Sequence, residues 1–172
     1  MITGGKAGKG DYTISDMTAI SQKTFIDTLP DTLRPLLPVA LQGFQVRRPW
    51  SLLQIHFGEA SLHYEVSHVG QRPGRLVTGW ELGFHCEARD HHLNRLLLDG
   101  FRRHLFEIKV SLGENVEAEM WDRGWTKIYK VFPDAPLTQA YRADVAGCLA
   151  EFITCIHPIF VELRRSAAEI YR

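Results

Sequence analysis

The chain has 172 residues, of which 45% are hydrophobic and 23% are charged, and its 20 basic residues balance its 20 acidic ones. This composition excludes a disordered chain, and the length is that of a single domain with its own core. The neutral balance disfavours nucleic acid as a partner, because nucleic-acid-binding proteins carry a basic excess or a basic stripe.

Neither a signal peptide nor a membrane span is expected, since no basic segment precedes an apolar stretch and no apolar run approaches about 18 residues. The three cysteines, Cys86, Cys148 and Cys155, form no Cys-x-x-Cys pair and fit buried packing positions better than disulfides. These features predict a cytoplasmic protein.

The N-terminal segment is rich in glycine and lysine but lacks the phosphate-binding loop pattern. Thr3 stands where that pattern needs its first glycine, and Gly10 stands where it needs a serine or threonine. We therefore expect a flexible tail over residues 1–14 and one α+β domain over residues 15–172.

Ser15 or Asp16 is a candidate cap for a first helix that runs towards Leu29, with Pro30 as its end. The next segment, up to Phe44, is interrupted by prolines and predicts only short helical turns.

Three β-strands follow, because apolar and polar residues alternate over Leu52–Phe57, Leu62–Ser67 and Trp80–Glu87. A two-residue turn at Gly58-Glu59 would pair Gln54 with His63. A loop centred near residue 74 would pair His63 with His85. Both registers place the apolar residues on one face of the sheet and the polar residues on the other.

The remainder alternates between helix and strand. Asp90 caps a predicted amphipathic helix that Gly113 ends, and a hairpin turning at residues 122–124 pairs Ala118 with Ile128 and Glu119 with Lys127. A long C-terminal helix follows, which Pro158 should kink or split. The predicted fold is an antiparallel sheet of about five strands, packed with a central amphipathic helix and a long C-terminal helix.

Three segments carry a resemblance to a known group: His63-Tyr64-Glu65-Val66, Glu81-Leu82-Gly83-Phe84-His85, and Leu112–Glu117 ahead of Trp121. They resemble uncharacterised bacterial domains that occur alone or beside restriction-type defence proteins. The resemblance covers roughly residues 50–165 and implies an accessory or binding domain, without any catalytic residue to transfer.

The polar face is a candidate metal or acid–base site. The registers gather five side chains, with Glu81 further along the sheet: His56, His63, Glu65, His85 and Glu87. Residues opposed in an antiparallel pair have β-carbons about 4.5–5.5 Å apart, so His63 and His85 could share zinc or manganese, with Glu87 or His56 as a third ligand. The competing interpretation is a solvated sheet face or an interface, where histidine and glutamate are common.

Trp121 and Trp125 flank the second hairpin turn on one face and are candidates for a protein interface, or for a purely structural pair. Other chemistry lacks support, since no serine or cysteine nucleophile motif is present and Glu107-Ile108-Lys109 falls on a predicted helix. The sequence thus favours a non-catalytic interaction or ligand-binding domain without a cofactor, with a homodimer or a protein partner. The alternative is a metal-dependent hydrolase or nuclease that uses the His/Glu face.

Overall fold

The computed structural model describes residues 17–70 and 78–170. The predicted tail and most of the loop between residues 70 and 79 lie outside these ranges. The helices are α1 (Gln22–Leu33), α2 (His91–Arg103), α3 (Leu105–Leu112) and α4 (Gln139–Ile170), with two short 3-10 helices at Arg34–Leu36 and Val39–Leu41. The strands are β1 (Gln45–Arg47), β2 (Leu53–His56), β3 (Leu62–Val69), β4 (Gly79–Cys86), β5 (Glu117–Met120) and β6 (Thr126–Pro133).

The strands form one antiparallel sheet in the order β1-β2-β3-β4-β6-β5. The α+β class, the antiparallel sheet and the long C-terminal helix are therefore confirmed. The expected number of about five strands is one short, because β1 is only three residues long and shows too little alternation to be recognised.

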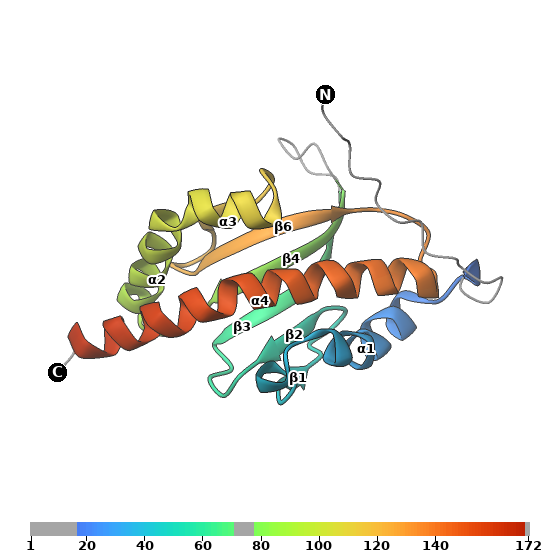
Figure 1. Ribbon diagram of the computed structural model, residues 1–172, viewed down its shortest axis with the longest axis horizontal. Coiled ribbons are helices and arrows are strands. Elements are labelled where there is room, and N and C mark those ends of the chain that lie inside the picture. Colours follow the sequence, from blue (N-terminus) through green and yellow to red (C-terminus); the bar gives the residue numbers. More distant parts are fainter. Residues whose placement is uncertain (1–16, 71–77, 171–172) are drawn as a thin grey trace, which may run out of the picture.

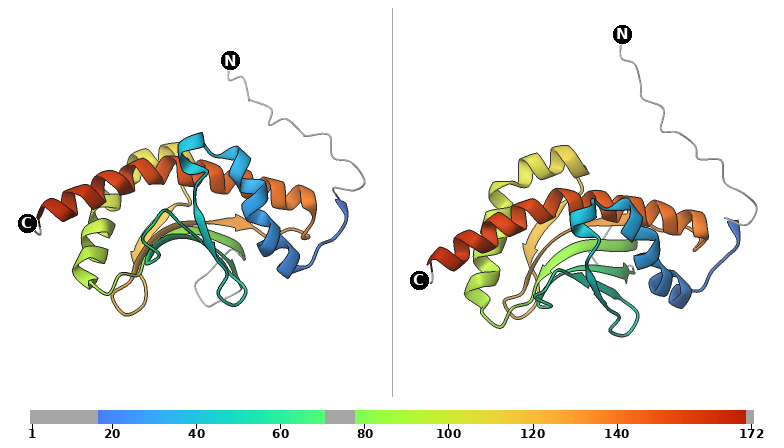
Figure 2. Two further views of the ribbon diagram at one scale, coloured as in Figure 1. Left: turned by 90° about the horizontal axis from the view of Figure 1, so that it is seen from below. Right: turned by 60° about the horizontal axis from the view of Figure 1, so that its bottom comes forward.

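The helices all lie on one side of a curved sheet, and α4 extends lengthwise over this side (Figures 1 and 2). The apolar sheet face packs against them, so that Tyr64 contacts Phe152, and Phe84 contacts Phe101 and Phe160. One hydrophobic cluster joins the sheet to all four helices. This arrangement leaves the polar face of the sheet on the side away from the helices.

Two of the three predicted registers are confirmed residue by residue. His63 pairs with His85 between β3 and β4, and Glu119 pairs with Lys127 between β5 and β6. The β2–β3 register is wrong by two residues, because the connection is longer than a two-residue turn and Gln54 pairs with Glu65. A shift of two keeps every side chain on its predicted face, since the strand period is two.

The first helix begins later and ends later than predicted. Ser21 caps it by accepting a hydrogen bond from the backbone NH of Thr24, and the helix continues through Pro30. Leu29 and Leu33 on either side of the proline are fully buried, and this burial offsets the one backbone hydrogen bond that a proline removes.

The predicted central helix is two helices, because the backbone at His104 leaves the helical range at φ −94° and ψ 2°. Its ends are as predicted. Asp90 accepts hydrogen bonds from the NH groups of His92 and Leu93, and Gly113 ends α3 with a φ of 104°.

The C-terminal helix α4 is not split at Pro158 but runs through it as one element. By length and composition alone its Gln139–Glu169 segment could cross a membrane, with a mean hydropathy of 1.5 in a window that is 39% buried. Core helices of soluble proteins also meet this criterion, and Leu149, Phe152 and Ile156 of α4 are fully buried against the sheet.

Gly79 provides a test of the register between β4 and β6. A β-carbon there would lie 2.0 Å from the carbonyl oxygen of Phe132, whose backbone pairs with β4. We expect Gly79→Ala to lower the free energy of unfolding by about 2 to 3 kcal/mol in urea denaturation, because the backbone cannot yield without disrupting the pairing.

Gly147 in α4 is the matched control, since a β-carbon there meets nothing within 4 Å. Gly147→Ala should raise stability by up to about 1 kcal/mol through helix propensity. Equal effects of the two substitutions would contradict the described pairing.

Candidate metal centre

The polar face of the sheet is buried at its centre, which corrects the expectation of a solvated face. His63 is 1% exposed, His85 2% and Glu81 3%. The curvature of the sheet and the loops at its two edges enclose these side chains, and neither can be foreseen from alternation alone. Buried polar groups need partners, so each contact of this cluster has to be accounted for.

His63 on β3 is oriented by the backbone just before its strand. Its Nδ1 lies 3.0 Å from the carbonyl oxygen of Ala60, and its Nε2 lies 3.4 Å from Oε2 of Glu65. A carbonyl oxygen only accepts, so Nδ1 carries the hydrogen and donates it. The Nε2 lone pair of a neutral ring therefore faces a carboxylate oxygen, a contact that requires a proton or a metal ion between the two atoms.

His85 on β4 is held between two carboxylates. Its Nδ1 lies 3.4 Å from Glu87, and its Nε2 lies 3.3 Å from Glu81. A neutral imidazole has one NH, so one of these two contacts has no donated hydrogen unless the ring is protonated or binds a cation. Lys127 donates hydrogen bonds to both Glu81 oxygens, at 2.8 and 2.9 Å, and so fixes the carboxylate behind the ring.

Gly83 lies between Glu81 and His85 on the same face of β4 and makes room for the imidazole. A β-carbon at this position would lie 3.1 Å from Nε2 of His85 and 3.0 Å from the β-carbon of Tyr129. A side chain at this position would therefore crowd the ring of His85. The glycine is a positioning residue that the sequence showed only as one step of the alternation.

The charges and hydrogen bonds of the cluster raise the pKa of His85 and lower the pKa of Glu65. Burial alone would lower the pKa of His85, but hydrogen bonds to Glu81 and Glu87 and the charge of Glu65 raise this pKa to about 9. Burial alone would raise the pKa of Glu65, but hydrogen bonds from His63 and Gln54 and the charge of His85 lower it to about 2. The cluster thus favours a positively charged His85 and an ionised Glu65.

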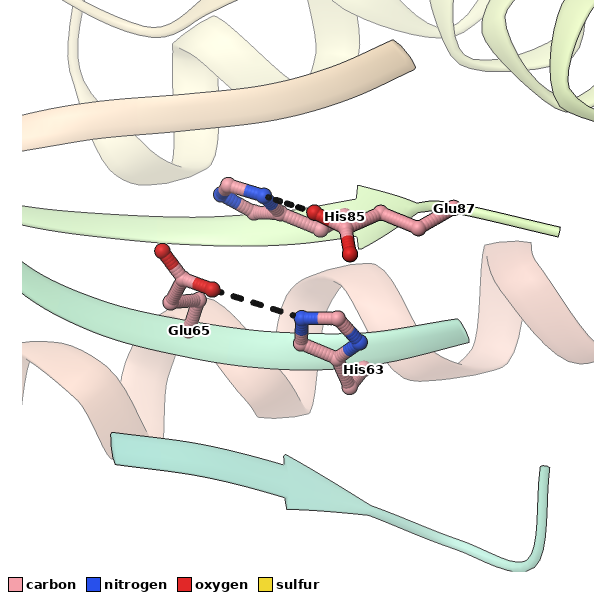
Figure 3. Close-up of side chains that lie close together, drawn as sticks. All are labelled: His63, Glu65, His85 and Glu87. Carbon is pink, nitrogen blue, oxygen red and sulfur yellow. Dashed lines mark hydrogen bonds and ion pairs between the residues drawn. The ribbon is translucent and has the colours of Figure 1, made fainter. Parts of the chain in front are cut away.

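Four potential ligand atoms converge at this point, one each from His63, Glu65, His85 and Glu87, and all lie within 4.8 Å of one another (Figure 3). His63 and Glu65 form a His-x-Glu pair on β3, and His85 on β4 forms a second pair with Glu87 directly after that strand. Because the two histidines are directly opposed, the glutamates lie on either side of them. The predicted set is therefore brought together except for His56.

His56 is buried on β2, and its Nδ1 makes no hydrogen bond to any residue in the described ranges. It lies two residues beyond Gln54, whose side chain donates a hydrogen bond to Glu65. By strand alternation it shares the face of the cluster. It is adjacent to the four convergent residues but does not belong to them.

A cavity of about 550 Å³ lies over the cluster, with His63, Glu65 and Glu87 in its lining. Trp121 and Trp125 form part of its wall, and their ring centres are 5.5 Å apart. The ring of Trp121 also packs against that of His85, with 5.6 Å between the ring centres. Arg47 at the end of β1 and Trp50 in the β1–β2 connection, which were not predicted as site residues, also line the cavity. The tryptophan pair, which the sequence suggested as an interface or a structural pair, lies in the wall of the candidate site.

No protein-family model matches the chain, and no similar curated protein or solved structure was found. The resemblance to bacterial domains of unknown function stays a prediction. The geometry of the site is therefore the basis for a functional proposal.

The titration of His85 can be measured in metal-free protein by NMR. We expect its midpoint near pH 9, and Glu81→Gln should lower it because that substitution removes a hydrogen-bonding carboxylate. A raised histidine pKa contributes stability that is fully present below the ordinary value of 6.5 and is lost as the pH rises through about 9. Unfolding of metal-free protein should therefore become easier across this range.

The exposed residue Glu162 offers the control, and Glu162→Gln should leave both the midpoint and the pH profile of stability unchanged. A midpoint near 6.5 that Glu81→Gln does not move would show that the ring is not held between the two carboxylates.

Proposed function

We propose that the protein is a divalent-metal-dependent hydrolase, with the metal ion bound by His63, Glu65 and His85 and with Glu87 as the general base. The observation that carries the proposal is the convergence of buried histidine and glutamate ligand atoms at the floor of a cavity. Two histidines and a glutamate form a ligand set that catalytic zinc sites use, and such sites keep an open position.

The surroundings of each ligand support this assignment. His63 donates its other ring NH to a backbone carbonyl, and His85 has Glu81 on its far side. Ring nitrogens of metal-bound histidines are oriented in this way by carbonyl or carboxylate partners. The contacts between the two rings and the carboxylates require either two additional protons or one divalent cation. A divalent ion bound between the rings carries the same charge as the two protons.

The two glutamates differ in a way that separates their roles. Glu65 is buried and accepts a hydrogen bond from Gln54, so it is fixed as a ligand. The Glu87 side chain is 20% exposed and lines the cavity, where a substrate and water would enter. A carboxylate in that place can accept a proton from water.

The reaction expected is hydrolysis of an ester or a phosphate ester. A bound divalent ion lowers the pKa of water and polarises the oxygen of the substrate. The water oxygen forms the new bond to carbon or phosphorus, and the bond to the leaving oxygen breaks with its electron pair. Glu87 takes the proton from the water and returns it to the leaving oxygen.

Calorimetric titration of chelator-treated protein with zinc or manganese tests the metal site. We expect one ion per chain, with a Kd on the order of 1 μM or tighter, and a loss of at least about 100-fold in His85→Ala. His104→Ala, at the α2–α3 junction, is the matched control and should bind normally. Normal binding by His85→Ala would rule out this metal centre.

Activity is tested with 4-nitrophenyl phosphate and 4-nitrophenyl acetate on the metal-loaded protein. Glu87→Gln should lower kcat by about 100-fold or more while metal affinity changes little, because the base and the ligands are different groups. A parallel loss of metal affinity and activity in Glu87→Gln would instead make Glu87 a ligand.

A non-catalytic ligand-binding domain is the second candidate, because the tryptophan-walled cavity suits a bound small molecule whether or not it reacts. Metal and ligand binding without turnover would favour it. Exposed apolar side chains on α3, with Phe106 at 80% and Val110 at 71%, support a homodimer or another protein partner. Unpaired cysteines support a cytoplasmic location.

A further inference from the structure

Trp50 is the most unusual residue at the rim of the cavity over the metal centre. Its side chain is 95% exposed, and its backbone adopts a left-handed φ of 52°. Bulky residues rarely adopt this conformation, which costs on the order of 1 to 3 kcal/mol, and such outliers cluster at ligand-binding sites. A large apolar ring held in water at that cost is explained by a ligand that covers it.

Arg47 gives the same rim a positive charge. It precedes Trp50 by three residues and lines the same cavity, and its side chain makes no hydrogen bond or ion pair with any residue that the structure describes. Its neighbour Arg48 is different, because it contacts both the backbone oxygen and the carboxylate of Asp27. The guanidinium of Arg47 is therefore available to an anionic group of a ligand.

The opposite wall offers further flat surfaces. Trp121 and Trp125 contact each other, and the apolar residues Pro49, Leu52 and Ala60 also line the cavity. Aromatic rings stack on planar groups, so the tryptophans suit a flat heterocycle. The cavity volume of about 550 Å³ lies within the usual range for small-molecule sites.

We propose that the cavity binds a mononucleotide, whose base stacks on the tryptophans and whose phosphate lies between Arg47 and the metal ion. This inference rests on the proposed metal-dependent function and names its substrate class. Arg47 is the sole arginine among the described lining residues, and the chain carries no net charge. A single nucleotide therefore fits better than a long nucleic-acid strand, which requires many basic contacts.

The test is calorimetric titration of zinc-loaded protein with adenosine 5′-monophosphate, adenosine and ribose 5-phosphate. We expect the complete nucleotide to bind at least about 10-fold more tightly than either fragment, because only it uses both the aromatic walls and the charged groups. Trp50→Ala and Arg47→Gln should each weaken nucleotide binding by about 5-fold or more. Neither substitution should change the zinc affinity, since neither residue is a metal ligand.

The matched controls are Phe106→Ala, an aromatic residue that is 80% exposed on α3, and Arg103→Gln, an exposed arginine on α2. Both should leave nucleotide binding unchanged. Nucleotide binding no tighter than that of ribose 5-phosphate, or unaffected by Trp50→Ala, would overturn the inference while the zinc titration still supports the metal centre.

The two proposals fail separately. If zinc does not bind, the hydrolase proposal fails, and the nucleotide is then titrated into metal-free protein. Quenching of tryptophan fluorescence that Trp50→Ala abolishes would still support a stacked base, whereas the absence of quenching would overturn the nucleotide inference as well.

Discussion

Three of the four ring nitrogens of His63 and His85 face carboxylate oxygens, and these contacts require protons or a cation between the two atoms. His63 Nε2 faces Glu65, and both nitrogens of His85 face carboxylates, at 3.3 to 3.4 Å. The two rings are buried, so a contact left without a hydrogen or a cation costs more there than it would at the surface. The function assigned to the protein depends on what carries that charge.

The rest of the fold positions this cluster. The register between β3 and β4 places the two histidines directly opposite each other, and the helices pack on the apolar face of the sheet. Gly83 leaves space for the ring of His85, while Lys127 neutralises the carboxylate behind it. A buried charged network is stable only when its members are paired, so these supports are part of the site.

Much of this arrangement follows from the alternation of residues in the sequence. The predicted opposition of His63 and His85 is correct, and even the mistaken β2–β3 register left every residue on its proper face because the error was two residues. The alternation assigns each side chain to one face of the sheet, but it does not show whether that face is exposed to solvent. Burial of the polar face depends on sheet curvature and on edge loops, which bring Trp50 and Trp121 over the same strands from distant parts of the chain. The helix breaks were also misjudged, since packing on either side of Pro30 outweighs its local effect.

The central claim is that one divalent metal ion supplies the charge that the cluster requires. Anomalous X-ray diffraction at the zinc edge, from crystals of zinc-loaded protein, tests it most directly. The account predicts one strong peak bonded to His63 Nε2, His85 Nδ1 and a Glu65 oxygen, at distances of about 2.0 to 2.2 Å. A fully zinc-loaded crystal with no peak among these atoms would contradict it.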